Sequence, residues 1–180
     1  MSRKSFLFMI AMVLAAGIVH AAPAEQPKTG QATSYAAGDD GDLETGVSWP
    51  SPRFTVDGTG LCITDNLTGL MWARTPDSAL RAWTTALTYA NGLSLCGYSD
   101  WRLPNINELE SLINAEQANA AAWLNTQGFI NVQDVSYWSS TTYAFSPAAA
   151  WWVNMRDSLV SADSKQNNSS VYAWPVRAGQ

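Results

Sequence analysis

Few side chains in this sequence have the chemistry of a nucleophile, a general base or a metal ligand. The 180 residues include one histidine, His20, and two cysteines, Cys62 and Cys96. His20 falls within an N-terminal segment that has the features of an export signal. Without that segment the chain has no imidazole, which excludes Ser-His-Asp and Cys-His nucleophile pairs, a histidine general base and histidine-ligated zinc or iron. We therefore expect no catalytic residues of these kinds.

The two cysteines are expected to form a disulfide between Cys62 and Cys96. In an exported protein, two well-separated cysteines are typical of a structural bridge. Closing the loop between them would stabilise the fold by about 3–4 kcal/mol on the chain-entropy model. A reactive or metal-binding thiol pair is the alternative.

Carboxylic acids are the acid–base groups that remain. Glycoside hydrolysis needs two carboxyl groups about 5–10 Å apart across a cleft. Four aspartates could supply such a pair, but their spacing singles out no two of them: Asp100, Asp134, Asp157 and Asp163. A carboxylate-dependent hydrolase is therefore one hypothesis for the function.

A second acidic group is a candidate for calcium binding. Asp39, Asp40 and Asp42 lie beside Gly38 and Gly41, and carboxylate oxygens are preferred ligands of Ca²⁺. The pattern lacks the glutamate at the twelfth position of an EF-hand loop. An Asp-Gly turn is the alternative, and apart from this candidate we expect no metal or cofactor.

A third group of residues could bind sugars. Along a strand predicted over 149–156, alternate side chains share a face, so that Trp152, Asn154 and Arg156 would lie together, opposite a core face. An indole ring packs against the apolar face of a pyranose, while amide and guanidinium groups hydrogen-bond to its hydroxyls. These three residues are the predicted ligand-binding site. The alternative is that Trp152 packs beneath a loop.

The first 21 residues are predicted to be an export signal. Arg3 and Lys4 precede an apolar run over 6–19, which is shorter than the 18 or more residues of a membrane span. Small residues follow at two cleavage sites, so that cleavage up to residue 24 is compatible with the pattern. We expect export to the periplasm or the extracellular medium, with no membrane span in the mature chain.

The mature chain is acidic and rich in tryptophan. Loss of Arg3 and Lys4 lowers the basic residues from 10 to 8 against 15 acidic ones, so the net charge falls from −5 to −7. This balance excludes nucleic acid as a partner, because phosphate binding needs a basic surface. The 47% hydrophobic content and nine tryptophans indicate a folded core.

The elements that position these residues are predicted to be a hairpin, then two helices, then several strands, in that order along the chain. An extended lead-in over 22–48 precedes one domain over 49–180. The second helix begins at Asn105, which has the spacing of a capping box with Glu108, so Glu108 is a cap rather than a catalytic acid. The other expected elements are a hairpin of strands 61–64 and 70–74, a first helix over 78–93, a loop or short helix over 114–130, and antiparallel strands over 135–142, 149–156, 159–162 and 171–177.

Four ordered stretches carry a resemblance to a known family. They are 64–72 (TDNLTGLMW), 96–105 (CGYSDWRLPN), 137–141 (YWSST) and 174–177 (WPVR). From about residue 38 to 180 the chain resembles the DUF1566 family, also called the Lcl C-terminal domain after a Legionella collagen-like adhesin. The resemblance implies an α+β, C-type-lectin-like fold related to the formylglycine-generating-enzyme group, with two helices and small twisted antiparallel sheets.

The resemblance also implies activities that this chain does not match. In the adhesin, the domain is associated with sulfated glycosaminoglycans and a trimer, but here a collagen-like stalk and a basic surface are missing. The related enzyme branch works through active-site cysteines. In this chain we expect Cys62 and Cys96 to form a structural disulfide instead. The sequence thus favours an exported, non-catalytic, adhesin-like module that binds a glycan or another envelope ligand. A structural or protein-interaction domain of the envelope is the main alternative.

Overall fold

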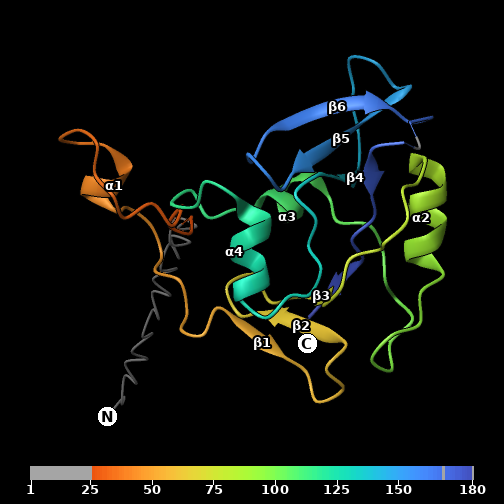
Figure 1. Cartoon of the computed structure of the whole chain (residues 1–180), viewed down its shortest axis with the longest axis horizontal. Coiled ribbons are helices and arrows are strands. Elements are labelled where there is room, and N and C mark those ends of the chain that lie inside the picture. The colour runs from red at the N-terminus through yellow and green to blue at the C-terminus, as the bar shows by residue number, and fades with distance from the viewer. Residues whose placement is uncertain (1–25, 168, 180) are drawn as a thin grey trace, which may run out of the picture.

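Two small sheets with helices packed between and beside them form the body of the domain (Figure 1). The structure is a computed structural model that describes residues 26–167 and 169–179. The predicted export signal, 1–21, lies outside the described residues. Helices and two separate sheets in one chain confirm the predicted α+β class.

The first sheet contains the predicted hairpin. Its strands are antiparallel, in the order β1-β2-β3-β8: β1 (Phe54–Val56), β2 (Cys62–Asp65), β3 (Leu70–Ala73) and β8 (Val176–Ala178). At the hairpin turn, the Gly69 N–H donates to the Asp65 carbonyl at 2.8 Å, with φ of +73° at Gly69. Glycine adopts this conformation without the steric cost that a Cβ would add. Strand β1 was not predicted, because three residues are too short to show an alternating pattern.

The second sheet is mixed rather than wholly antiparallel. Its order is β6-β5-β4-β7: β4 (Ser136–Thr142), β5 (Ala149–Asn154), β6 (Val160–Ser164) and β7 (Val171–Tyr172). Strands β4 and β7 are parallel. The predicted single strand 171–177 is therefore wrong, because the chain leaves this sheet after Tyr172 and joins the first sheet as β8. Pro175, which has no N–H for a ladder, lies at the crossing.

Short helices connect and cover the sheets: α1 (Asp40–Leu43), α2 (Trp83–Asn91), α3 (Ile106–Glu110) and α4 (Ala120–Thr126). Helix α2 begins at Trp83 instead of at the predicted residue 78. The preceding residues are held extended, because the N–H of Arg81 donates to the Val171 carbonyl and that of Trp83 to the Lys165 carbonyl, both at 3.0 Å. Among the described residues, no helix has the length and hydropathy that crossing a membrane requires.

The main core is built around a continuous row of aromatic rings. The row contains Trp123, Phe54, Phe129, Trp174, Tyr137 and Tyr172 in that order, with successive ring centroids 5.0–6.0 Å apart. We call it the aromatic row. Offset and edge-to-face pairs of this kind contribute about 0.5–1.5 kcal/mol each beyond the area that they bury. A smaller second core lies between α2 and the second sheet, around Ala86, Leu103 and Trp138.

The predicted disulfide is confirmed. Cys62 on β2 is bonded to Cys96, with the two Cα atoms 6.4 Å apart. The bridge joins the first sheet to the segment that follows α2. The disulfide therefore tethers the segment between α2 and α3 to the first sheet.

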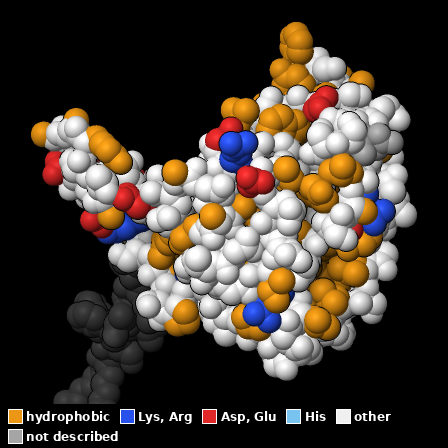
Figure 2. All heavy atoms as spheres, viewed as in Figure 1, with side chains coloured by type: hydrophobic (Ala, Val, Ile, Leu, Met, Phe, Trp, Pro, Cys, Tyr) orange, Lys and Arg blue, Asp and Glu red, His pale blue; other side chains and the backbone are white. Residues whose placement is uncertain are grey.

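The described part of the predicted lead-in, residues 26–48, is bonded to the body. The Trp49 indole N–H donates to the Lys28 carbonyl at 2.8 Å, and the N–H of Ala115 donates to the Thr29 carbonyl at 3.0 Å. The carboxylate of Glu116 accepts from the N–H groups of Ala32 and Thr33, each at 2.9 Å. Beyond these contacts the segment carries α1, which projects from the body (Figures 1 and 2).

Candidate functional site

Two tryptophans that contact each other line a surface cavity of about 510 Å³. Trp49, just before β1, and Trp123, on α4, have ring centroids 5.9 Å apart and planes inclined at 43°. Uncharged polar side chains also line the cavity, among them Asn114, Thr126 and Gln127. We call this cavity the tryptophan pocket.

The side chain of Arg53 contributes to the tryptophan pocket from below. Its guanidinium carbon lies 4.1 Å from the centroid of the Trp49 ring and 5.8 Å from that of Trp123. Nε and Nη2 donate to the buried carboxylate of Asp65 at 3.3 and 3.2 Å, and Nη2 also donates to the Ser111 carbonyl. Within the described residues, no group accepts a hydrogen bond from Nη1 of Arg53. A buried donor without a partner costs about 1–3 kcal/mol, which the stacked Trp49 ring partly offsets.

The tryptophan pocket has the chemistry of a site for an uncharged polar ring. Two indoles offer apolar faces, and amide and hydroxyl groups at the rim can donate and accept hydrogen bonds. The positive charge of Arg53 is balanced by Asp65, which forms an ion pair with it in the protein interior.

The predicted ligand-binding residues are divided between core and turn. Trp152 is half-buried against the second core, where Trp138 is its cross-strand partner. Asn154 ends β5 and accepts a hydrogen bond from the N–H of Arg156 at 2.8 Å. Arg156 lies exposed in the following turn, so the predicted extension of the strand to residue 156 is wrong. The contacts favour the alternative in which Trp152 packs in the interior, and its binding role stays a prediction.

The calcium candidates accept hydrogen bonds from backbone N–H groups. Asp39 caps α1, and its carboxylate accepts from Tyr35, Ala36 and Asp42 at 2.7–3.1 Å. The bond from the Tyr35 N–H is the largest cause of a pKa below the ordinary value for Asp39, and it outweighs the opposing effect of desolvation. Asp42 accepts from the Gly38 N–H at 2.8 Å, and Asp40 accepts from the Thr29 hydroxyl. These contacts match the turn alternative.

One other cluster contains metal-ligating residue types. Among the described residues, Asp57, Cys62 and Cys96 bring such atoms within 4.8 Å of one another. Because both sulfurs belong to the disulfide, they are not available as thiolate ligands.

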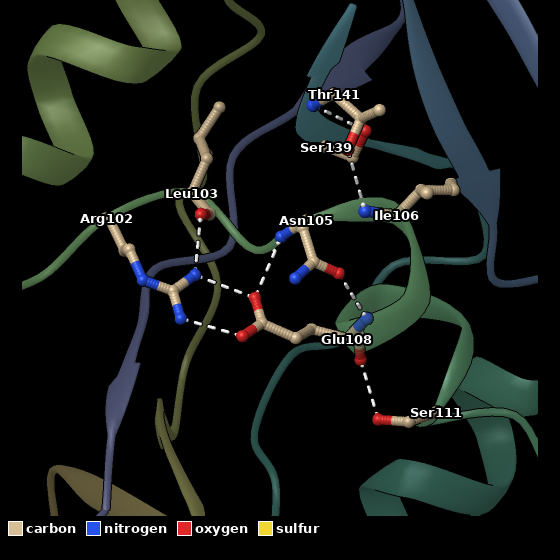
Figure 3. A network of polar contacts seen from close by, with 8 residues as sticks. All are labelled: Arg102, Leu103, Asn105, Ile106, Glu108, Ser111, Ser139 and Thr141. Carbon is tan, nitrogen blue, oxygen red and sulfur yellow. Dashed lines mark hydrogen bonds and ion pairs between the residues drawn. The ribbon is translucent and has the colours of Figure 1, made fainter.

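The capping box predicted at Asn105 is confirmed (Figure 3). The Asn105 side chain accepts from the Glu108 N–H at 2.9 Å, and the Glu108 carboxylate accepts from the Asn105 N–H at 2.8 Å. Arg102 adds a bidentate contact to the same carboxylate, with both N–O distances 2.7 Å. Burial raises the pKa of Glu108, but the bonds from Arg102 and Asn105 outweigh it, so the pKa lies below its ordinary value. Glu108 is therefore an ionised cap, as its spacing predicts.

The same network attaches α3 to the second sheet. The N–H of Ile106 donates to the Thr141 hydroxyl at 3.1 Å, and the N–H of Thr141 donates to the Ser139 hydroxyl at 3.2 Å (Figure 3). Ser139 in turn donates to the Trp151 carbonyl at 2.9 Å. These bonds fix the start of the helix against β4 and β5.

The stretches that carry the family resemblance contribute buried residues and ion pairs to the fold, and 174–177 is buried throughout. Asp65 pairs with Arg53, and Asp100 accepts two bonds from Arg177 at 2.7 and 3.1 Å. Arg177 is buried, and this ion pair and the stacked Tyr98 ring neutralise and cover its guanidinium. The motifs thus hold the fold together.

The family model described as the Lcl C-terminal domain matches residues 61–177. The chain belongs to the Lcl C-terminal domain family. No curated protein matched the chain.

In this Lcl C-terminal domain the tryptophan pocket lies across the boundary of the family match. Trp123 falls inside the matched residues, whereas Trp49 and Arg53 precede them. Sequence reasoning missed the pocket, because no spacing connects tryptophans on opposite sides of the hairpin and two helices. The available signal was the pairing of Trp49 with Arg53 at the start of the domain, where an aromatic ring and a guanidinium could stack.

Proposed function

We propose that this Lcl C-terminal domain is an exported, non-catalytic module that binds a glycan in the tryptophan pocket. The observation that carries the proposal is the pair of tryptophans 5.9 Å apart above a rim of amide and hydroxyl groups. Indole faces and nearby hydrogen-bonding groups are the combination that a sugar ring requires. The predicted signal segment supports delivery to the periplasm or the medium, which fractionation of expressing cells tests.

The charge of the surface favours an uncharged sugar over a sulfated one. The guanidinium of Arg53 is already paired with Asp65, and the basic side chains lie apart from one another on the face shown in Figure 2. A polysulfate binds best to clustered basic side chains, because several charges must be neutralised together.

The state of the acidic residues supports a non-catalytic role. Four carboxylates are engaged in ion pairs with arginine side chains: Asp65, Asp77, Asp100 and Glu108. Among the described residues that line the tryptophan pocket, none is a carboxylic acid. A glycosidase would need a protonated and an ionised carboxyl group on either side of the bound sugar.

A glycan array tests the proposal. The chain without residues 1–21 is applied to neutral and acidic glycans, including bacterial surface polysaccharides, with and without calcium. We expect a neutral glycan to be retained by the wild-type chain and lost in Trp123→Ala. Phe145→Ala is the matched control, because its ring is 88% exposed and lies outside the tryptophan pocket.

A parallel variant, Trp152→Ala, separates the two candidate surfaces. If the folded Trp152→Ala variant loses glycan retention and Trp123→Ala keeps it, the tryptophan pocket is not the binding site. The predicted site on β5, around Trp152, would then be supported. A blank array for the wild-type chain would favour the protein-interaction alternative. Thermal unfolding of each variant identifies any loss that comes from misfolding.

A further inference from the structure

A second cavity, of about 270 Å³, lies where the chain leaves β3 and where β7 ends. The half-buried ring of Tyr172 forms one wall, and Pro76 adds an apolar surface. Asn131 and Gln133 contribute exposed amides at the rim. We call this cavity the tyrosine pocket, and it repeats the combination of aromatic wall and amide rim.

The one carboxylate in the tyrosine pocket is already paired. Asp77 is buried and forms an ion pair with Arg81, and it also accepts from the Ala79 N–H at 3.2 Å. The pairing leaves the pocket with no unbalanced charge from Asp77. Both cavities therefore favour an uncharged polar ligand.

The two pockets are joined by one short segment of chain. Gln127 lines the tryptophan pocket and Asn131 lines the tyrosine pocket, and the four Cα–Cα steps between these two residues span at most about 14 Å. In Figure 1 this segment runs from the end of α4 toward β3.

The connecting segment is held firmly on the body. Arg74, which follows β3, donates through Nε to the Gly128 carbonyl at 2.7 Å, and its own carbonyl accepts from the Ile130 N–H at 2.9 Å. Phe129 is buried in the aromatic row, whereas Ile130 is exposed. The surface between the pockets is thus a fixed backbone with an outward apolar side chain.

We infer that the tryptophan and tyrosine pockets are two subsites for one linear, uncharged glycan that crosses residues 127–131. The inference rests on the proposed function, because it requires the tryptophan pocket to bind sugar. A polymer that occupies both pockets gains the second contact without a second loss of translational freedom, so affinity rises with chain length.

Calorimetric titration with oligosaccharides of increasing length tests the inference. The probes are the malto-, cello- and chito-oligosaccharides from disaccharide to octasaccharide. For whichever of these three series binds, we expect affinity to increase with the number of sugar units until both pockets are filled. The double variant Asn131→Gly/Gln133→Ala should weaken the longest probe at least tenfold, which corresponds to about 1.4 kcal/mol of binding free energy, and leave the disaccharide unchanged.

Asn131→Gly is chosen because it preserves the backbone. Asn131 has φ of +56°, a conformation that glycine adopts at no steric cost, so the fold should be retained. Thermal unfolding of the double variant checks this, and Gln133→Ala alone is the second variant should the double one unfold.

The outcomes separate the two proposals. If Trp123→Ala abolishes binding at all lengths while the double variant binds the longest probe normally, the two-subsite inference is wrong and the proposed function stands. If affinity does not depend on length, the inference is equally overturned. If none of the three series binds, the inference falls, and the array decides the proposed function independently.

Discussion

At the scale of single residues, two arginine–aspartate pairs differ in how much water reaches them. The side chains of Arg53 and Asp65 are 4% and 0% exposed, whereas in the second pair Arg177 is 5% exposed and its partner Asp100 is 60% exposed. Loss of one partner from a buried pair leaves a charge without compensation, while water can replace a partner at the surface. The same contact type thus has different consequences at the two positions.

Asp65→Asn should lower the free energy of unfolding by about 3–5 kcal/mol, because Arg53 would stay buried without its counter-charge. Asp100→Asn should lower it by less, because Asp100 is largely exposed and water can take its place beside Arg177. Urea denaturation of both variants measures the difference. Equal losses would contradict the assignment of Asp65 as the buried counter-ion of Arg53.

At the scale of elements, α3 shows how local sequence and distant contacts combine. Asn105 and Glu108 are three residues apart, so the capping box could be predicted from the sequence. The bidentate contact with Arg102 and the bond to Thr141 require the chain to fold back, and no local pattern contains that information.

The depressed pKa of Glu108 predicts an acid-dependent contribution to stability. Because its pKa in the folded protein is below that in the unfolded chain, the stabilisation is complete above the unfolded value, about 4.3, and is lost as pH falls through the folded value. Glu108→Gln should therefore reduce the slope of unfolding free energy against pH in that acid range.

Denaturant unfolding over a pH series measures this slope. Glu110→Gln, an exposed change on the same helix, is the control and should keep the wild-type slope. An unchanged slope in Glu108→Gln would show that the carboxylate titrates alike in both states, against the network of Figure 3.

The strands show where prediction from sequence stops. Alternation identified β4, β5 and β6, because each runs long enough to present two distinct faces. Alternation could not show that residues 171–177 contribute a strand to each of the two sheets. The pattern tells which side chains share a face of a strand, but it does not tell which other strand pairs with it. The start of α2 was placed too early for a related reason, because bonds to Val171 and Lys165 override local helix propensity.

At the scale of the whole molecule, the tryptophan pocket depends on the complete fold. Trp49 reaches it from the segment before β1 and Trp123 from α4, and each is held by its own neighbours. The sequence could predict the disulfide and the fold class, which rest on local or compositional signals. A pocket between distant segments has no such signal.

Removal of the disulfide should be costly for the whole domain. Cys62 and Cys96 are separated by 34 residues, so Cys62→Ala/Cys96→Ala should lower the free energy of unfolding by about 3–4 kcal/mol on the chain-entropy model. Denaturation of the oxidised wild type beside this variant measures the loss. A wild-type sample treated with a reductant should approach the variant, and a difference that persists after reduction would point to the buried Cys62 side chain instead.

The crossing of the chain between the two sheets sets the order in which the domain can fold. Strand β7 pairs with β4 and strand β8 with β3, and between them the buried indole of Trp174 donates to the Ala73 carbonyl at 2.8 Å. During synthesis, neither sheet has its full set of strands until residues 171–178 have left the ribosome. The final strands of the chain therefore close both layers in a single late event.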